Sequence, residues 1–151
     1  MTEDTLELTY DIYIAAAPIK VWAGLIDPTM TSQYVYGTEF DGRVEKGANY
    51  AYVAKGGFKV VDGEILEAKP HQRLAMSWAA HWDENVAKDA PSRVSYELTE
   101  AAPGITKLRV VHNGFRGQTA TYASSSGAWP QMMSSLKSLI ETGHSLSMGT
   151  E

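Results

Sequence analysis

The chain has 151 residues, of which 44% are hydrophobic and 21% charged, a composition ordinary for one globular domain with a sizeable core. Its formal net charge is −5 and it has no cluster of Lys or Arg, which argues against a nucleic-acid groove or an anionic membrane surface as its partner. Because it contains no cysteine, disulfides and thiolate chemistry are excluded, and a reducing, cytoplasmic location is expected.

The first part of the chain predicts one strand followed by two short helices. Apolar residues alternate over residues 6–14, which is typical of a half-buried strand. Pro18 opens an amphipathic helix that Asp27-Pro28 ends, and residues 29–34 predict a second, one-turn helix. The acidic first ten residues have no apolar centre, so they do not resemble a signal peptide, and no run reaches the roughly 18 apolar residues of a membrane span.

The middle of the chain changes to strand periodicity. Short connections rich in turn residues, such as Lys55-Gly56-Gly57, predict a meander of antiparallel neighbours. Gly63 lies inside one of these strands and predicts a bulge or a bend, and hence a curved sheet. The six strands are expected at residues 38–40, 49–54, 58–67, 73–82, 93–99 and 106–113, with a longer polar loop over residues 82–92.

The last predicted element is a helix over residues 128–143 with a wide apolar stripe. Gly143 stands where a left-handed C-terminal residue would sit, and residues 118–127 are expected to be an early helical turn or a loop. The stripe starts with bulky, adaptable side chains and ends with ordinary aliphatic ones, as expected of a helix that roofs a ligand cavity at one end. Its members, at steps of three and four, are Trp129, Met132, Met133, Leu136, Leu139 and Ile140.

This order of elements predicts an α+β helix-grip fold in a single domain, residues 1–151, with an ordered core over about residues 6–146. In this fold a curved antiparallel sheet of about seven strands wraps around the long C-terminal helix, with two short helices after the first strand. One helix cannot cover both faces of so large a sheet, so the sheet must curve around it. Because a wide sheet cannot close completely on one cylinder, we expect a cavity between the concave face and the helix.

Four segments carry a family resemblance and together span nearly the whole chain. They are IYIAAAPIKVWAGLIDP, GEILEAKPHQRLAMSW, LRVVHNGF and AWPQMMSSLKSLIETG, beginning at Ile12, Gly63, Leu108 and Ala128. In this order they resemble the activator of heat-shock-protein-90 ATPase C-terminal-like family of the START-like, or SRPBCC (birch-pollen-allergen-like), superfamily. The resemblance implies the helix-grip fold. It implies no single function, because the fold serves lipid carriers, hormone and metabolite binders, polyketide cyclases and co-chaperones.

Alternation along the strands predicts which side chains face the cavity. The large apolar members of each strand are expected to point inward, where aromatic and thioether walls suit a flat or hydrophobic ligand. The candidate ligand-binding residues are Tyr50, Tyr52, Val61, Ile65, Met76, Trp78, Tyr96, Val110, His112, Trp129, Met132 and Met133.

His112 is the sharpest single candidate because it shares the inward face with Val110. A neutral imidazole there could anchor a polar group of a ligand or act as an acid or base near neutral pH. The other interpretation is a core histidine satisfied by Tyr96 or by a backbone carbonyl. His81 has the opposite orientation and no third ligand stands at a suitable spacing, so no metal site is predicted. No motif indicates a cofactor, and no residue is assigned a catalytic role.

Three functional hypotheses follow from these residues and from the resemblance. The first is non-enzymatic binding of a small hydrophobic or aromatic molecule. The second is a polyketide cyclase-like or hydrolase-like enzyme using His112 and a tyrosine such as Tyr96. The third is a protein-interaction module related to the co-chaperones, with an exposed apolar or charged patch outside the cavity. The eukaryotic co-chaperones carry a second, N-terminal domain that this sequence does not show, so a chaperone ranks behind a small ligand. A homodimer is compatible with the chain, although no feature specifies one.

Overall fold

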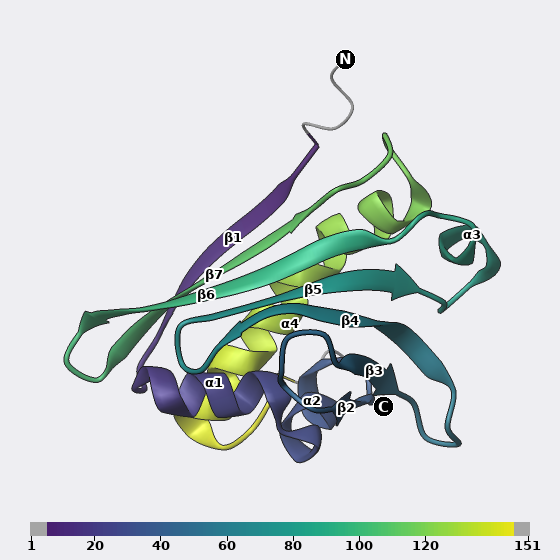
Figure 1. The fold of residues 1–151 in the computed structure, drawn as a ribbon. Coiled ribbons are helices and arrows are strands. Elements are labelled where there is room, and N and C mark those ends of the chain that lie inside the picture. Colours follow the sequence, from purple (N-terminus) through teal and green to yellow (C-terminus); the bar gives the residue numbers. More distant parts are fainter. Residues whose placement is uncertain (1–5, 147–151) are drawn as a thin grey trace.

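The computed structural model describes residues 6–146, so the expectations about the two ends of the chain concern residues outside the described range. Seven antiparallel strands form one curved sheet in the order β1-β7-β6-β5-β4-β3-β2, and the long helix α4 crosses its inner face (Figure 1). This confirms the predicted helix-grip class. The elements are β1 (Leu8–Ile14), α1 (Pro18–Ile26), α2 (Pro28–Tyr34), β2 (Glu39–Gly42), β3 (Asn49–Val53), β4 (Lys59–Lys69), β5 (Arg73–Ala80), α3 (Glu84–Ala87), β6 (Ser92–Ala102), β7 (Ile105–Asn113) and α4 (Ala120–Thr142).

Side-chain alternation places one face of the sheet in the core. Strand partners lie directly opposite one another, so residues in one register row share a face. One such row crosses five strands and is buried throughout. It consists of Leu8, His112, Val94, Met76 and Ile65.

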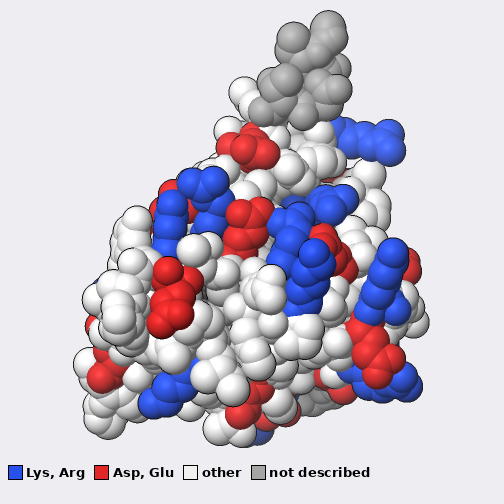
Figure 2. All heavy atoms as spheres, turned by 60° about the vertical axis from the view of Figure 1, so that its left-hand side comes forward, with Lys and Arg blue, Asp and Glu red and all other residues white. Residues whose placement is uncertain are grey.

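The outer face carries a ladder of alternating charges. Arg109 donates to both carboxylate oxygens of Asp11, over 2.7 and 2.9 Å. Arg73 donates to Glu67 over 2.7 Å and to Glu97 over 2.6 Å. Figure 2 shows positive and negative side chains interspersed over the face in view. Opposite charges on neighbouring strands therefore support the sheet without forming a patch of one sign.

Gly63 marks a close approach between β4 and β5. The predicted bulge is real but lies further along, where the register shifts between Ile65 and Glu67. A Cβ atom at position 63 would stand only 2.3 Å from the carbonyl oxygen of Ser77. That oxygen accepts a hydrogen bond of 2.6 Å from the Tyr50 hydroxyl, which reaches across from β3. The position therefore needs glycine because of contact with a backbone, and not because of the bulge.

The first short helix follows its predicted boundaries, and the second begins one residue earlier than predicted. Pro18 is the first residue of α1 and Pro28 the first of α2, positions that suit a residue without an N–H group. Asp27 ends the first helix and caps the second, since its side chain accepts a hydrogen bond of 2.8 Å from the Thr29 N–H. In Figure 1 both helices lie across one end of the sheet, beside the later half of α4.

The helix α4 begins at Ala120, and not at residue 128 as predicted. Its first two turns contain Ser, Thr and Gly, which favour helix only weakly. Hydrogen bonds to Thr119 and Asp89 offset this weak helix preference. Thr119 caps the Tyr122 N–H, and the carboxylate of Asp89 accepts from both the N–H and the hydroxyl of Thr121, over 2.8 and 2.6 Å.

Pro130 lies within α4 and would leave one carbonyl of the helix without a partner. Because proline has no N–H, the carbonyl of Ser126, four residues earlier, loses its helical donor. The hydroxyl of Tyr10 in β1 donates to this carbonyl over 3.0 Å. A side chain of the first strand thus completes the hydrogen bonding of the last helix.

Smaller differences lie around the loop between β5 and β6. The strand ends at Ala80, so Trp82 is not part of it, and the expected loop contains the short helix α3, capped by Asp83. Gly143 ends α4 with φ 87°, which confirms the predicted left-handed residue. None of the helices within residues 6–146 is long and apolar enough to cross a membrane.

Candidate functional site

A cavity of about 310 Å³ lies between the sheet and the first half of α4. Its volume is at the small end of the range for ligand pockets. The walls come from the connection after α2, from strands β3 to β5, from the segment after β5 and from α4. The lining residues are Val35, Tyr36, Thr38, Tyr52, Val60, Val61, Trp78, Trp82, Ser124, Ser125, Ala128, Trp129 and Met132.

All thirteen lining residues are uncharged. Their polar groups are the hydroxyls of five residues and the indole nitrogens, and the rest of the wall is carbon and sulfur. An ionised group moved from water into such surroundings loses its hydration without gaining a countercharge. The cavity therefore suits neutral molecules.

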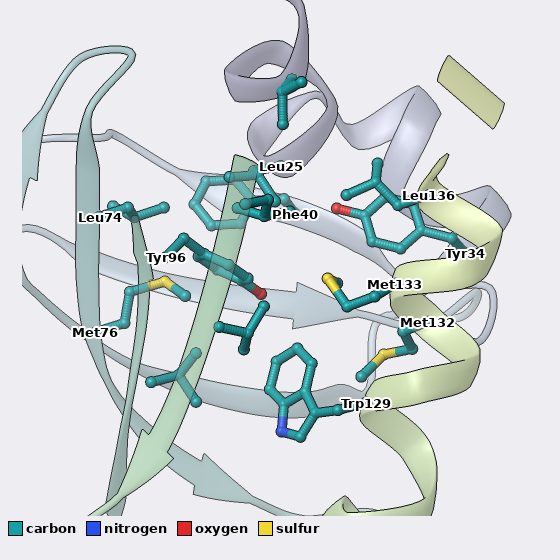
Figure 3. Packing of buried hydrophobic residues seen from close by; sticks show 14 of the residues in the cluster. Leu25, Tyr34, Phe40, Leu74, Met76, Tyr96, Trp129, Met132, Met133 and Leu136 are labelled. Carbon is teal, nitrogen blue, oxygen red and sulfur yellow. The ribbon is translucent and has the colours of Figure 1, made fainter. Parts of the chain in front are cut away.

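Trp78 of β5 joins the two aromatic walls of the cavity. Its ring centroid lies 5.7 Å from that of Tyr52 on β3 and 5.6 Å from that of Trp129 on α4. Figure 3 shows Trp129 and Met132 projecting from α4 toward the sheet, at the end of the helix where the predicted stripe is bulkiest. These rings present flat, apolar surfaces to the enclosed space.

His112 is fully buried and both of its ring nitrogens have partners. The indole N–H of Trp129 donates to Nδ1 over 3.0 Å, and Nε2 lies 2.7 Å from the hydroxyl oxygen of Ser92. Because Nδ1 accepts, the neutral ring carries its proton on Nε2 and donates to Ser92. Burial lowers the pKa of His112 to about 3. His112 is thus a satisfied core histidine, but its partners are Trp129 and Ser92 and not Tyr96 or a backbone carbonyl.

The structure brings five of the twelve predicted ligand-binding residues to the cavity: Tyr52, Val61, Trp78, Trp129 and Met132. The other seven are buried in the surrounding core, namely Tyr50, Ile65, Met76, Tyr96, Val110, His112 and Met133. Strand alternation identifies the inner face of the sheet, but it does not say which part of that face α4 leaves uncovered.

The sequence analysis missed eight lining residues, most of them in connections or in the first turns of α4. They are Val35, Tyr36, Thr38, Val60, Trp82, Ser124, Ser125 and Ala128. Two of them, Tyr36 and Trp82, are aromatic side chains with exposed fractions of 65% and 38%. Large aromatic side chains in loops beside a predicted cavity were the available signal. They place exposed rings at the mouth of the cavity.

The buried phenols are held in their neutral form. Burial raises the pKa of Tyr52 to about 12 and that of Tyr96 well above its ordinary value. His81, the other histidine considered for a metal, lies 3.0 Å from the carboxylate of Asp62. Within residues 6–146, no group of three or more His, Asp or Glu side chains could hold a metal ion.

Comparison with solved structures relates this fold to known proteins. The chain is similar to protein MLL2253 from Mesorhizobium loti, with a TM-score of 0.74 and 27% identity, covering 89% of this chain and 96% of that one. It is similar to the Aha1 dimer from Colwellia psychrerythraea, with a TM-score of 0.72 and 19% identity over 91% and 98% of the two chains. It also resembles DynU16, named as a protein of the dynemicin biosynthetic locus, with a TM-score of 0.72 and 20% identity over 92% and 48%. At 19% and 20% identity, the similarities to the Colwellia protein and to DynU16 support a shared fold and not a shared function.

Comparison of sequences points to one family. No curated protein matches the chain. The model of the family described as Activator of Hsp90 ATPase homolog 1-like protein matches residues 15–141, which include every element from α1 to the last turns of α4. The chain therefore belongs to the Activator of Hsp90 ATPase homolog 1-like family, within the START-like group of folds.

Proposed function

We propose that the protein binds a small, uncharged hydrophobic or aromatic molecule in the cavity between the sheet and α4. The observation that carries this proposal is the partly open cavity of about 310 Å³ with thirteen uncharged residues on its walls. A helix packed only for stability would fill that space with side chains, as the later half of α4 does with Leu136 and Leu139. The dynemicin locus named for the similar DynU16 supports a link to small-molecule chemistry.

Filling the cavity provides the direct test. Ala128 lines the cavity, whereas Ala123 lies exposed on the same helix and does not contribute to the lining. We expect the wild-type protein to bind the three-ring hydrocarbon fluorene, with a rise in melting temperature and a change in tryptophan fluorescence. Ala128→Phe should weaken fluorene binding at least tenfold, and Ala123→Phe should leave it unchanged. Equal affinities in the two variants would contradict binding in this cavity.

The enzymatic alternative has less support from the geometry. An acid or base working on a substrate must reach it, and His112 is not among the residues that line the cavity. Its two nitrogens are occupied by Trp129 and Ser92, and its low pKa keeps it neutral at physiological pH. His112 is better explained as a residue that positions Trp129.

A chaperone partner is the second candidate. It is supported by the description of the family and by the similarity to an HSP90 activator from Plasmodium falciparum. Co-purification of purified Hsp90 with the full chain tests it, and no retention at micromolar concentrations would count against it. The dimeric state of the similar Colwellia protein supports a homodimer in the same way, and light scattering of the purified chain distinguishes it from a monomer.

A further inference from the structure

One buried hydrogen-bond donor beside the cavity has no partner. Among the buried side-chain nitrogens and oxygens of residues 6–146, the indole nitrogen of Trp78 is the single one without a hydrogen bond. Trp78 is only 5% exposed and lines the cavity. Buried N–H groups are nearly always paired, because leaving one unpaired loses the hydrogen bond it made to water. This exception therefore calls for a physical explanation.

The polar side chains of Trp129, His112 and Ser92, near Trp78, are hydrogen-bonded to one another. The N–H of Trp129 goes to His112, and the opposite nitrogen of His112 pairs with the Ser92 hydroxyl. That hydroxyl also lies 3.5 Å from the backbone oxygen of Trp78 itself. These bonds fix the ring of Trp129 in the wall, and none of the groups that make them accepts from the Trp78 indole. Because other atoms of Trp78 line the cavity, a ligand bound there is the nearest source of an acceptor from outside the chain.

We propose that the cavity selects flat, uncharged molecules that carry a carbonyl or ether oxygen, and that this oxygen accepts a hydrogen bond from the indole nitrogen of Trp78. This rests on the proposed function and specifies the ligand class for the same site. The nitrogen has no accessible surface, so this bond requires the indole to turn toward the cavity on binding. A carboxylate would also accept the bond, but the lining supplies no positive charge to balance it.

The test uses two probes that share one ring system. Fluorene and 9-fluorenone differ by a single carbonyl group. Trp78→Phe keeps an aromatic ring in the wall and removes the donor. We expect this substitution to weaken 9-fluorenone binding about five- to tenfold more than it weakens fluorene binding, measured by isothermal titration of the full chain. Trp82→Phe, the same replacement at the mouth of the cavity, should change both affinities by the same factor.

The outcomes separate this inference from the function on which it rests. If both probes bind and Trp78→Phe weakens them equally, the donor role is wrong and the binding function stands. If neither probe binds the wild-type protein, both proposals are wrong. Should the variant fail to fold, nitrogen-15 spectra of the wild-type chain decide the question. The indole N–H signal of Trp78 should then move downfield with 9-fluorenone and not with fluorene, and identical shifts with both would overturn the inference.

Discussion

His112 shows how one buried residue can position a cavity wall that it does not itself line. Its ring accepts a hydrogen bond from Trp129 and donates one to Ser92, so these two partners select the neutral tautomer with the proton on Nε2. Its parity in β7 predicted an inward orientation, and the orientation is correct. The role differs because the indole of Trp129, 17 residues further along the chain, donates to the ring nitrogen that would otherwise be free to bind a ligand. Only the packing of α4 on the sheet brings these two residues together.

The lowered pKa of His112 predicts that the stability of the protein depends on pH. Its pKa in the folded protein is about 3, below the ordinary value of 6.5, so between these limits the unfolded chain binds a proton that the folded one does not. Falling pH therefore favours unfolding, by about 1.4 kcal/mol per pH unit from this group, with no contribution above about pH 7. Between pH 6.5 and 5, urea unfolding should show the wild-type protein losing about 1.6 kcal/mol more than His112→Gln.

Spectroscopy gives an independent check on the same group. The imidazole nitrogen-15 shifts of His112 should remain those of the neutral Nε2-protonated ring from pH 8 to pH 5. A titration with a midpoint near 6.5 would contradict a buried ring that is hydrogen-bonded at both nitrogens.

Gly63 predicts a second effect at the scale of one residue. A methyl group there would meet the Ser77 carbonyl oxygen at 2.3 Å, and a backbone atom cannot move aside as the end of a side chain can. Gly63→Ala should cost about 2–3 kcal/mol of unfolding free energy. Gly127→Ala, on the exposed face of α4 with no atom within 4 Å, should instead stabilise by about 0.5–1 kcal/mol. Chemical denaturation measures both, and equal effects of the two substitutions would refute the close approach.

Among the elements, α4 has two parts with different surroundings. Its later half is packed among buried aliphatic residues, whereas its first half forms a wall of the cavity. Pro130 lies near the boundary between the two parts, one turn of helix before it or less, and the hydroxyl of Tyr10 replaces the hydrogen bond that this proline removes. The first half thus depends on β1 and on Asp89 for its hydrogen bonding, which explains why local helix preference did not predict it.

A double-mutant cycle tests this link between the first strand and the last helix. Tyr10→Phe should cost about 1 kcal/mol in unfolding free energy, because it removes the side-chain hydrogen bond to the Ser126 carbonyl. In a Pro130→Ala background the helix can supply its own N–H, so the cost of Tyr10→Phe should shrink by about half or more. Tyr13→Phe, an exposed tyrosine on the same strand, serves as the control and should be within 0.5 kcal/mol of wild type. Additive effects of Tyr10→Phe and Pro130→Ala would contradict the link.

At the scale of the whole molecule, the fold could be predicted far better than the site. Strand and helix periods are local, and they predicted the seven strands, the two short helices after the first strand and the closing helix from residue 128 onward. The cavity arises from what that helix leaves uncovered, which depends on loop paths and on caps supplied from distant residues. Sequence periodicity therefore predicted the cavity residues Trp78, Trp129 and Met132, which lie on regular elements. It could not predict Tyr36 or Trp82, which line the cavity from the connections.

The four tryptophans offer the most direct measurement of the central claim, which is ligand binding in this cavity. Trp78, Trp82 and Trp129 line the cavity, whereas Trp22 lies in α1 with its ring against His71. In nitrogen-15 spectra of the full chain titrated with fluorene, the three lining indole signals should shift together along one saturating curve while the Trp22 signal stays in place. Unchanged signals at all four positions, or a Trp22 shift as large as the others, would contradict a ligand site between the sheet and the first half of α4.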